Sequence, residues 1–249
     1  MKLTFLAHSG FMIDDGTRCY VFDYYQDPAD VVKKAEAEGR TLWFFVTHDH
    51  GDHFAPDIGR FAAERYFIHK DVPTDSFTHV MAVAEANTGG TEQLSEVVGN
   101  GRVTLMEVGD TVTVEGIEIR MFGSTDAGGS FAVRLPEGNI FHAGDLNWWH
   151  WVGDTRENNR EARANTEREF AKLKGESFDV VFFPVDARLE EAREWGVLSF
   201  LEVVKAEKLL VSMHHFGEAW APSPYFKACH EALPLWIPSQ CGEEFDIVI

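Results

Sequence analysis

Cysteine is scarce in this sequence: only Cys19, Cys229 and Cys241 occur in 249 residues. They are widely spaced and form no C-x-x-C pair, so the pattern favours neither a disulfide framework nor a thiolate zinc site. A reducing compartment fits this usage best. The sequence also lacks an apolar run long enough to span a membrane and an N-terminal secretory signal. We therefore expect a soluble, cytoplasmic protein.

Basic residues are also few. The chain has 22 Lys and Arg against 41 Asp and Glu, which gives a formal net charge of −19. A field of this sign repels phosphate backbones and anionic membrane surfaces. We therefore expect a small-molecule substrate, and neither nucleic acid nor a membrane as a partner. Solubility alone explains the acidity equally well, because a metal site can attract an anion locally whatever the distant charges do.

The first part of the chain has a strand, helix, strand pattern. Residues 3–23 contain three short runs rich in β-branched or aromatic side chains, and the turn signal DDGT separates the last two as in a hairpin. A helical pattern follows, with Asp27 as its expected cap and Gly39 just past its end. Residues 42–46, LWFFV, form a continuous apolar run, which is typical of a strand covered on both faces.

The rest of the chain first predicts more strands and then helices. Residues 103–143 contain short β-type runs separated by turn signals, which predict a meander, and residues 156–175 predict a charged helix. Nearer the C-terminus, the strand-like residues 179–185, the helical pattern over 189–207 and the strand-like 208–213 predict a βαβ unit.

The segment THDHGDH, residues 47–53, directly follows the buried strand predicted over 42–46. In an extended chain, side chains two positions apart point to the same side, so His48 and His50 can share one metal ion. Imidazole ligands suit zinc, iron, nickel and copper. Asp52 and His53 are placed to turn back and form a second ion site.

A solvated histidine-rich loop is the alternative interpretation of this segment, and Asp49 or Asp52 would then only cap a helix. Crowding these groups at the end of a buried strand without an ion would cost several kcal/mol in desolvation and repulsion. We therefore favour metal binding. Gly51 is expected to let the chain turn sharply after His50.

The H-x-H-x-D-H pattern at 48–53 resembles the signature of the metallo-β-lactamase fold hydrolases. The resemblance extends to the order of elements over nearly all of residues 1–249, for which we expect a single domain because no linker or repeat interrupts the chain. It implies an α/β architecture, an αβ/βα sandwich of two mixed β-sheets with helices on the outer faces. It also implies one or two metal ions at the sheet edges.

The resemblance assigns roles residue by residue. His48 and His50 correspond to ligands of the first metal, and Asp52 and His53 to ligands of the second. Asp145, in FHAGDLN, corresponds to the Asp that bridges the two ions. Asp52 is in addition the residue expected to orient or deprotonate the nucleophile.

Four further residues are expected near the site. The last ligand histidine of the family follows a C-terminal strand, and SMHHFG offers His214, with His215 as the less favoured register. We prefer His214 because the spacing resembles the branch that includes lactonase-like and phospholipase-like hydrolases. Asp23 resembles the early Asp that supports the site loop, and His8 resembles a site-proximal histidine, although a buried histidine bonded to backbone is at least as well supported.

One ligand of the family pattern is missing. The family has a further histidine before the bridging Asp, but here no histidine occurs between His79 and His142. The segment GSTDAGGS has Ser124 at the usual position and Asp126 shortly after it. Three interpretations remain open: Asp126 binds as an oxygen ligand, water completes a weak first site, or only the second metal binds. Turn chemistry also accounts for this segment. Zinc is the first expectation, with manganese or iron possible.

The segment after Asp145 is rich in tryptophan. Trp148, Trp149 and Trp151 are expected to place at least one ring beside the metals, since they cannot all point into the core of one element. Asp186 and Arg188 follow another strand and are weaker candidates for supporting the site.

The pattern favours hydrolysis with a metal-activated water, since a bound metal lowers the pKa of water from about 15.7 towards about 7. No G-x-S-x-G motif indicates a serine nucleophile. The expected function is a metal-dependent hydrolase of a small ester, lactone or phosphodiester. A non-catalytic metal-binding or sensing protein is the alternative, and a nuclease is the third hypothesis.

Overall fold

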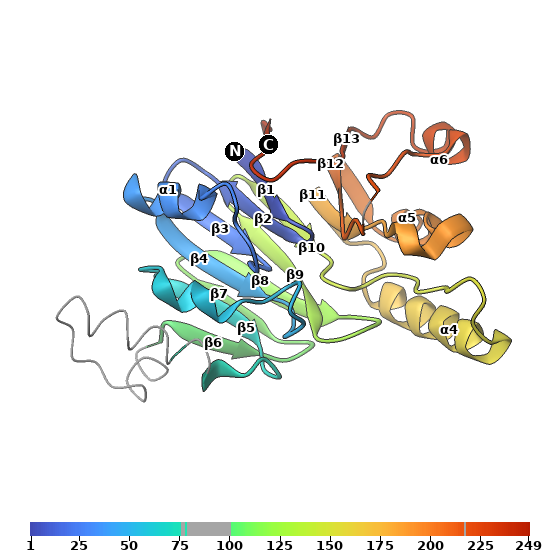
Figure 1. Cartoon of the computed structure of the whole chain (residues 1–249), viewed down its shortest axis with the longest axis horizontal. Coiled ribbons are helices and arrows are strands. Elements are labelled where there is room, and N and C mark those ends of the chain that lie inside the picture. The colour runs from blue at the N-terminus through green and yellow to red at the C-terminus, as the bar shows by residue number, and fades with distance from the viewer. Residues whose placement is uncertain (76–77, 79–100, 217) are drawn as a thin grey trace. The chain divides into compact units, whose positions relative to one another are not determined.

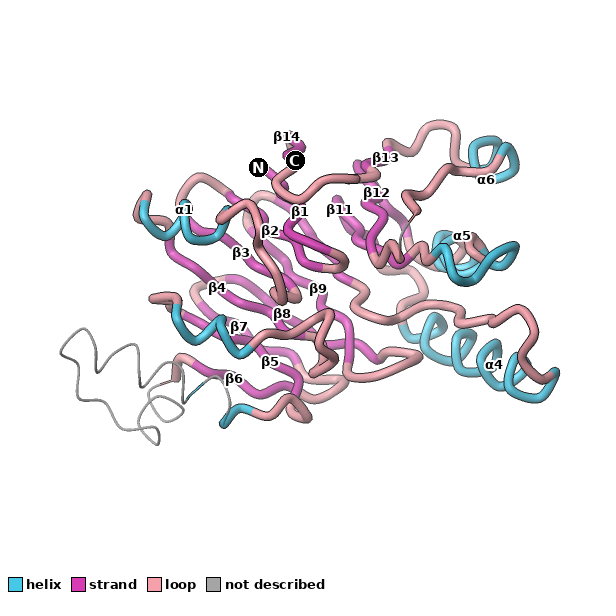
Figure 2. The backbone as a smooth tube through the Cα atoms, in the orientation of Figure 1, coloured by secondary structure: helices cyan, strands magenta, loops and turns pink. Residues whose placement is uncertain are grey.

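The computed structural model describes residues 1–75, 78, 101–216 and 218–249. The chain divides into two compact units: unit 1 comprises Met1–Glu107 and Gln240–Val248, and unit 2 comprises Val108–Ser239 with Ile249. Each unit is built on one seven-stranded sheet (Figures 1 and 2). The single domain expected from the sequence therefore stays a prediction. In the described part of the chain, no helix is long and apolar enough to cross a membrane.

The sheet of unit 1 has the strand order β14-β1-β2-β3-β4-β5-β6. Its strands are β1 (Lys2–Ala7), β2 (Gly10–Asp14), β3 (Arg18–Phe22), β4 (Thr41–Val46), β5 (Arg65–His69), β6 (Val103–Met106) and β14 (Glu244–Asp246). The pairs from β14 to β3 are antiparallel and those from β3 to β6 are parallel. The predicted strands and the hairpin between β2 and β3 are confirmed.

Helix α1 (Val31–Ala37) starts later than the sequence pattern suggests, but Asp27 still stabilises its start. The carboxylate of Asp27 accepts hydrogen bonds from the N–H groups of Val31 at 2.9 Å and Val32 at 2.8 Å. These N–H groups have no partner within the helix, so the carboxylate satisfies them. Gly39, with φ 83°, follows the end of the helix as expected. A short 3₁₀ helix, η1 (Pro56–Arg60), lies between β4 and β5.

Both faces of β4 are buried, as its uninterrupted apolar sequence predicts. Phe44 lies in the core cluster that also contains Val32 of α1. Phe45 points to the opposite face, where its ring stacks between Phe22 and Phe67 at centroid distances of 4.6 and 5.1 Å. This packing fixes the strand from which the histidine segment emerges.

The sheet of unit 2 has the strand order β13-β12-β11-β10-β9-β8-β7. Its strands are β7 (Thr111–Val114), β8 (Ile117–Gly123), β9 (Gly129–Leu135), β10 (Gly138–His142), β11 (Ser177–Pro184), β12 (Lys205–Met213) and β13 (Leu235–Trp236). Strands β7 to β10 form an antiparallel meander, and β10 to β13 are parallel.

The predicted meander over 103–143 is wrong at its start. Residues Val103–Met106 form β6, which pairs parallel with β5 in the sheet of unit 1. The local pattern predicts a strand, but it carries no information on the sheet that the strand joins. That choice depends on pairing with residues such as Tyr66 and Ile68, which lie far away in the sequence.

Helix α4 (Arg156–Lys172) is confirmed, and it is the longest helix drawn in Figure 2. The side chain of Thr155 caps it by accepting the N–H of Asn158 at 3.1 Å. Its buried Phe170 packs against Phe183 of β11 and Phe200, with ring centroids 6.3 and 5.5 Å apart. The helix therefore covers part of the sheet of unit 2.

The long helix predicted over 189–207 is wrong in extent, although the βαβ unit itself is confirmed. The chain forms the 3₁₀ helix η2 (Ala187–Ala192), then α5 (Trp195–Leu201), and β12 takes over at Lys205. Glu190 breaks the helical path with φ 52° and ψ −120°. The last part of the pattern is strand because Lys205 pairs with Ser177 of β11. A short helix, α6 (Pro224–Cys229), precedes β13.

Candidate metal centre

The predicted site residues follow the carboxyl ends of parallel strands in both sheets. In unit 1, Asp23 follows β3, and the segment 47–53 follows β4. In unit 2, residues with the same position are Asp145 after β10, Asp186 after β11 and His214 after β12. This edge of a mixed sheet is where ligands commonly bind, because the strands end there and loops present polar groups.

Asp23 is the centre of the polar contacts in unit 1. It is fully buried and has a left-handed backbone, with φ 45°. Its carboxylate accepts hydrogen bonds from the N–H and the hydroxyl of Thr47, each at 2.8 Å, and lies 2.8 Å from Nδ1 of His53. An ionised carboxylate only accepts, so Nδ1 of His53 carries the proton and Nε2 keeps the lone pair that binds a metal.

His48 is oriented through the same group of residues. Its Nδ1 lies 2.9 Å from the hydroxyl of Thr47. Because that hydroxyl gives its one proton to Asp23, Nδ1 of His48 donates, and Nε2 again keeps the lone pair. Donor atoms of His48 and His53 lie within 4.8 Å of each other. The sequence interpretation missed Thr47, whose only signal was its place directly before the first histidine.

The segment after β4 turns at His50. The N–H groups of both His53 and Phe54 donate to the carbonyl of His50, at 2.9 and 3.0 Å, so one helical turn brings His53 back to His48. The exposed ring of His50 lies 4.5 Å from that of His48. A Cβ on Gly51 would meet nothing within 4 Å, and the residue is not left-handed. The turn therefore does not need the glycine that the sequence interpretation assigned to it.

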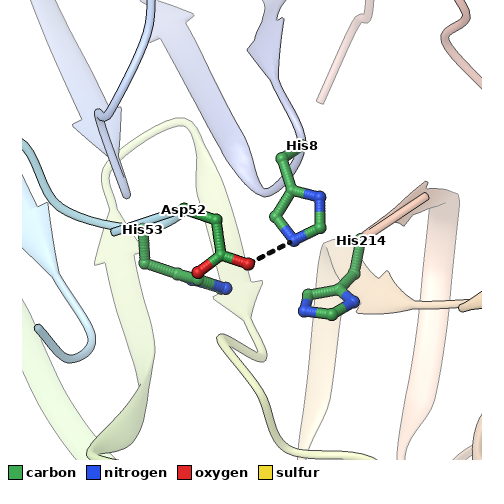
Figure 3. Close-up of side chains that lie close together, drawn as sticks. All are labelled: His8, Asp52, His53 and His214. Carbon is green, nitrogen blue, oxygen red and sulfur yellow. Dashed lines mark ion pairs between the residues drawn. The ribbon is translucent and has the colours of Figure 1, made fainter. Parts of the chain in front are cut away.

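His8 joins this group from the turn between β1 and β2. Its backbone is left-handed, with φ 54°, and its Nε2 lies 3.4 Å from Oδ2 of Asp52. Figure 3 shows this ion pair as a dashed line, with His53 in the same part of unit 1. Donor atoms of His8, Asp52 and His53 all lie within 4.8 Å of one another. The structure thus places His8 beside two predicted ligands, and its role at the site stays a prediction.

His214 has an equivalent support in unit 2. Its Nδ1 lies 3.0 Å from Oδ2 of Asp186, and its backbone is left-handed with φ 59°. Burial raises the pKa of Asp186, but the hydrogen bonds from His214 and Arg188 outweigh it and lower that pKa to about 2. Asp186 is therefore ionised, and Nδ1 of His214 donates to it. The pairing of Asp186 with Arg188 is tight, at 2.6 Å.

The other nitrogen of His214 is directed at Asp145. Nε2 lies 3.2 Å from Oδ1 of Asp145, and both side chains are nearly fully buried. A lone pair facing a carboxylate is repulsive unless a proton or a cation lies between them. Two ligands of one tetrahedral zinc ion lie roughly 3.3 Å apart, given bonds of about 2.0 to 2.1 Å. The observed separation therefore fits two ligands of a shared ion.

The segment around Asp126 is tied to the loop that carries Asp145. The hydroxyl of Thr125 donates to the carbonyl of Asn147 at 2.6 Å and accepts the N–H of Asn147 at 2.9 Å. Carboxylate oxygens of Asp126 and Asp145 lie within 4.8 Å of each other. The N–H of Asp126 donates to the hydroxyl of Ser124 at 3.2 Å, so the expected turn is present. Asp126 is exposed, and its role as a ligand stays a prediction.

The tryptophans after Asp145 separate into two groups. The indole N–H of Trp149 donates to the carbonyl of Asp145 at 2.9 Å, and its ring lies 5.3 Å from that of His214. Trp148 instead packs against Trp195, with ring centroids 5.4 Å apart. Of the two rings named as site residues, only Trp149 therefore contacts a predicted ligand.

His215 has a different environment from His214. Its Nε2 lies 2.9 Å from the hydroxyl of Ser212. Burial, together with the nearby charge of Arg193, lowers the pKa of His215 to about 4. A neutral histidine bonded to a hydroxyl is typical of a packed interior, and this contrast favours His214 as the ligand.

Comparison with known proteins adds the family context. No family model matches the chain. The chain is 24% identical over 155 residues to the UPF0173 metal-dependent hydrolase of Pyrobaculum neutrophilum. The aligned region covers 58% of this chain and 61% of that relative. The match thus spans less than two thirds of the relative's length.

Two solved structures share the fold. The metallo-β-lactamase fold protein YhfI from Bacillus subtilis matches with a TM-score of 0.53 and 13% identity, over 98% of each chain. The chain therefore has the metallo-β-lactamase fold. The short form of human tRNase Z matches with a TM-score of 0.55 and 13% identity, over all of both chains. At these identities the likeness shows the fold alone, and it confirms the predicted α/β class with two mixed β-sheets.

The donor set of this metallo-β-lactamase fold chain fits a first-row divalent metal. Imidazole nitrogens and carboxylate oxygens suit zinc, manganese and iron alike. The contacts of His53 with Asp23 and of His214 with Asp186 support metal binding more strongly than the donor types do. Metal-binding histidines usually donate the hydrogen on their other ring nitrogen to a carboxylate. The residues present therefore fit the ion that the fold implies.

Proposed function

We propose that this chain is a metal-dependent hydrolase that acts on a small ester, lactone or phosphodiester. The ligands that we assign to one or two ions, with zinc as the first choice and manganese or iron as alternatives, are His48, His50, Asp52, His53, Asp145, His214 and, in place of the missing histidine, Asp126. The name of the Pyrobaculum relative supports metal-dependent hydrolysis. The paired carboxylate–histidine contacts in each unit carry the proposal.

When bound, a divalent metal would polarise the substrate's carbonyl or phosphoryl oxygen and lower the pKa of a water molecule towards about 7. The chain's own residues prepare for this. Asp23 and Asp186 hold His53 and His214 in the tautomer that offers Nε2. Both imidazoles are therefore oriented before an ion arrives, which reduces the entropy lost on binding.

Asp52 is the residue that we assign to proton transfer. Its side chain is 35% exposed, so water reaches it. Nε2 of His8 lies 3.4 Å from Oδ2 of Asp52 and would orient the carboxylate, which would take a proton from the attacking water. Trp149 covers one side of His214 and excludes bulk water there.

Activity of the metal-loaded protein on a panel of esters, lactones and phosphodiesters tests the proposal. We expect hydrolysis of at least one class that disappears on chelation and returns with added metal. Tight metal binding without hydrolysis of any of them would favour the alternative, a non-catalytic metal-binding or sensing protein.

A nuclease is the second candidate, and the fold likeness to human tRNase Z supports it. The net charge of −19 argues against it, because phosphate backbones are repelled. RNA binding at low salt that weakens steeply as salt rises would favour the nuclease. Absence of binding at every salt concentration would favour a small substrate.

A further inference from the structure

A cavity of about 790 Å³ lies in unit 2, next to the first turns of α4. Its volume falls in the range of small-molecule pockets. The residues used below line it: Trp148, Trp151, Val152, Arg156, Arg160 and Trp195. Among the described residues that line it, none is a metal ligand assigned above.

Arginine gathers on the helical side of this cavity. Arg156, Arg160 and Arg163 are spaced so that they share one face of α4, and all three line the cavity. Arg163 pairs with Glu167 at 2.7 Å. Two carboxylates, Asp154 and Glu191, also line the cavity, but within the part of the chain that the structure describes neither forms an ion pair with Arg156 or Arg160. In a chain of net charge −19, a cavity whose lining has three arginines against two carboxylates is locally positive, which indicates a site for an anion.

Aromatic and apolar side chains line the same cavity, and the guanidinium group of Arg163 lies over the ring of Trp148 at 5.6 Å. Trp195 is 37% exposed and Val152 is 42% exposed, so both present apolar surface to the cavity that they line. Trp195 also packs against Trp148 and against His150, with ring centroids 5.4 and 4.6 Å apart. Flat, partly exposed rings beside guanidinium groups suit a planar ligand that stacks on one side and pairs its charge on the other.

The cavity wall is held in place before any ligand binds. The side chain of Asn159 in α4 accepts the N–H of Trp151 at 3.0 Å and donates to its carbonyl at 2.9 Å. Trp151 in turn stacks on Trp149, with centroids 5.9 Å and planes 10° apart, and Trp149 contacts His214. The wall therefore continues from the cavity to a predicted metal ligand within the same unit.

We propose that this cavity binds a planar organic anion, an aromatic ring that carries a carboxylate or phosphate group. Its role would be to hold the anionic part of the substrate while the scissile bond lies beyond Trp149 near His214. That role rests on the proposed hydrolase function, whereas anion binding at the cavity does not.

Binding of 1-naphthoate to the purified full chain tests the proposal, followed by tryptophan fluorescence and calorimetry. We expect 1-naphthoate to bind at least about tenfold more tightly than the neutral 1-naphthalenemethanol, and less tightly as salt rises. Arg156→Gln and Arg160→Gln together should lower the affinity by about tenfold. Arg168→Gln removes one arginine charge from α4 outside the cavity, and it should leave the affinity within about twofold.

Three results would overturn the proposal: no binding of 1-naphthoate, equal binding of the neutral analogue, or unchanged affinity in the double arginine variant. The cavity proposal and the hydrolase proposal can be contradicted independently of each other. A chain that hydrolyses esters but does not bind 1-naphthoate contradicts the cavity alone. A chain that binds 1-naphthoate through its arginines but holds no metal contradicts the hydrolase alone.

Discussion

Nδ1 of His53 lies 2.8 Å from the carboxylate of Asp23, and both side chains are fully buried. His214 and Asp186 have the same relationship at 3.0 Å in the other unit. Each sheet thus fixes one imidazole with a carboxylate from a neighbouring strand end. Burying such a pair costs desolvation energy, and the arrangement is explained if the other imidazole nitrogen, Nε2, binds an ion.

Replacing Asp23 with Asn should weaken metal binding by about ten- to a hundredfold, because the support that fixes the tautomer of His53 is lost. The measurement is competition of the metal with a chelator of known affinity. Asp27→Asn, which alters only the cap of α1, is the matched control and should keep the affinity. Equal metal affinity in Asp23→Asn and wild type would contradict the supporting role.

The neighbours His214 and His215 should respond differently to the same change. Asparagine tolerates the left-handed backbone at His214, so His214→Asn removes the imidazole without adding much strain. We expect it to lose bound metal by elemental analysis. His215→Asn should retain metal and lower the melting temperature, since it disturbs a partly buried contact with Ser212. Retention of metal in His214→Asn with loss in His215→Asn would reverse the assignment.

Asp126→Ala tests the substitute for the missing histidine. If Asp126 is a ligand, the variant should bind less metal, and the loss should be greatest at the first site, with His48 and His50. Asp110→Ala, in the same unit and directly before β7, serves as a control for the removal of one carboxylate. Full stoichiometry and full activity in Asp126→Ala would show that the residue only forms the turn.

Two glycines should show opposite responses to alanine. Gly196 lies in α5, where alanine normally stabilises by about 1 kcal/mol. Here its Cβ would overlap the amide oxygen of the buried Asn147, so we expect Gly196→Ala to lower the free energy of unfolding by about 1 to 3 kcal/mol. Gly51→Ala has open space and should stay within about 0.5 kcal/mol and keep its metal. Denaturant unfolding measures both, and a stabilised Gly196→Ala would contradict the packing.

The sequence predicted those parts of the site that are local. Residues 47–53 carry their spacing in the sequence, and the apolar run before them predicts the strand that presents them. Thr47 and Thr125 were not found, because one hydroxyl among many gives no signal until the fold shows its partners. The support of His214 by Asp186 was only a weak candidate, since it joins the ends of two strands that meet through tertiary pairing.

The fold was predicted to a similar extent. Apolar runs predicted the strands, but β6 joined a different sheet from the one expected because pairing is set by distant residues. The break in the helix at Glu190 was missed because the residues around it are good helix formers. The predicted helix also extended too far, because β12 begins at Lys205. Local propensity is a weak guide wherever tertiary pairing competes with it.

A crystal structure of the metal-loaded protein, with anomalous diffraction recorded at the absorption edge of the bound metal, tests the central claim most directly. The account predicts anomalous peaks roughly 2.0 to 2.1 Å from Nε2 of His53 and from Nε2 of His214, with carboxylate oxygens of Asp52 or Asp145 completing the coordination. A metal-loaded crystal with no peak at these two nitrogens, or with metal bound only through other side chains, would contradict it.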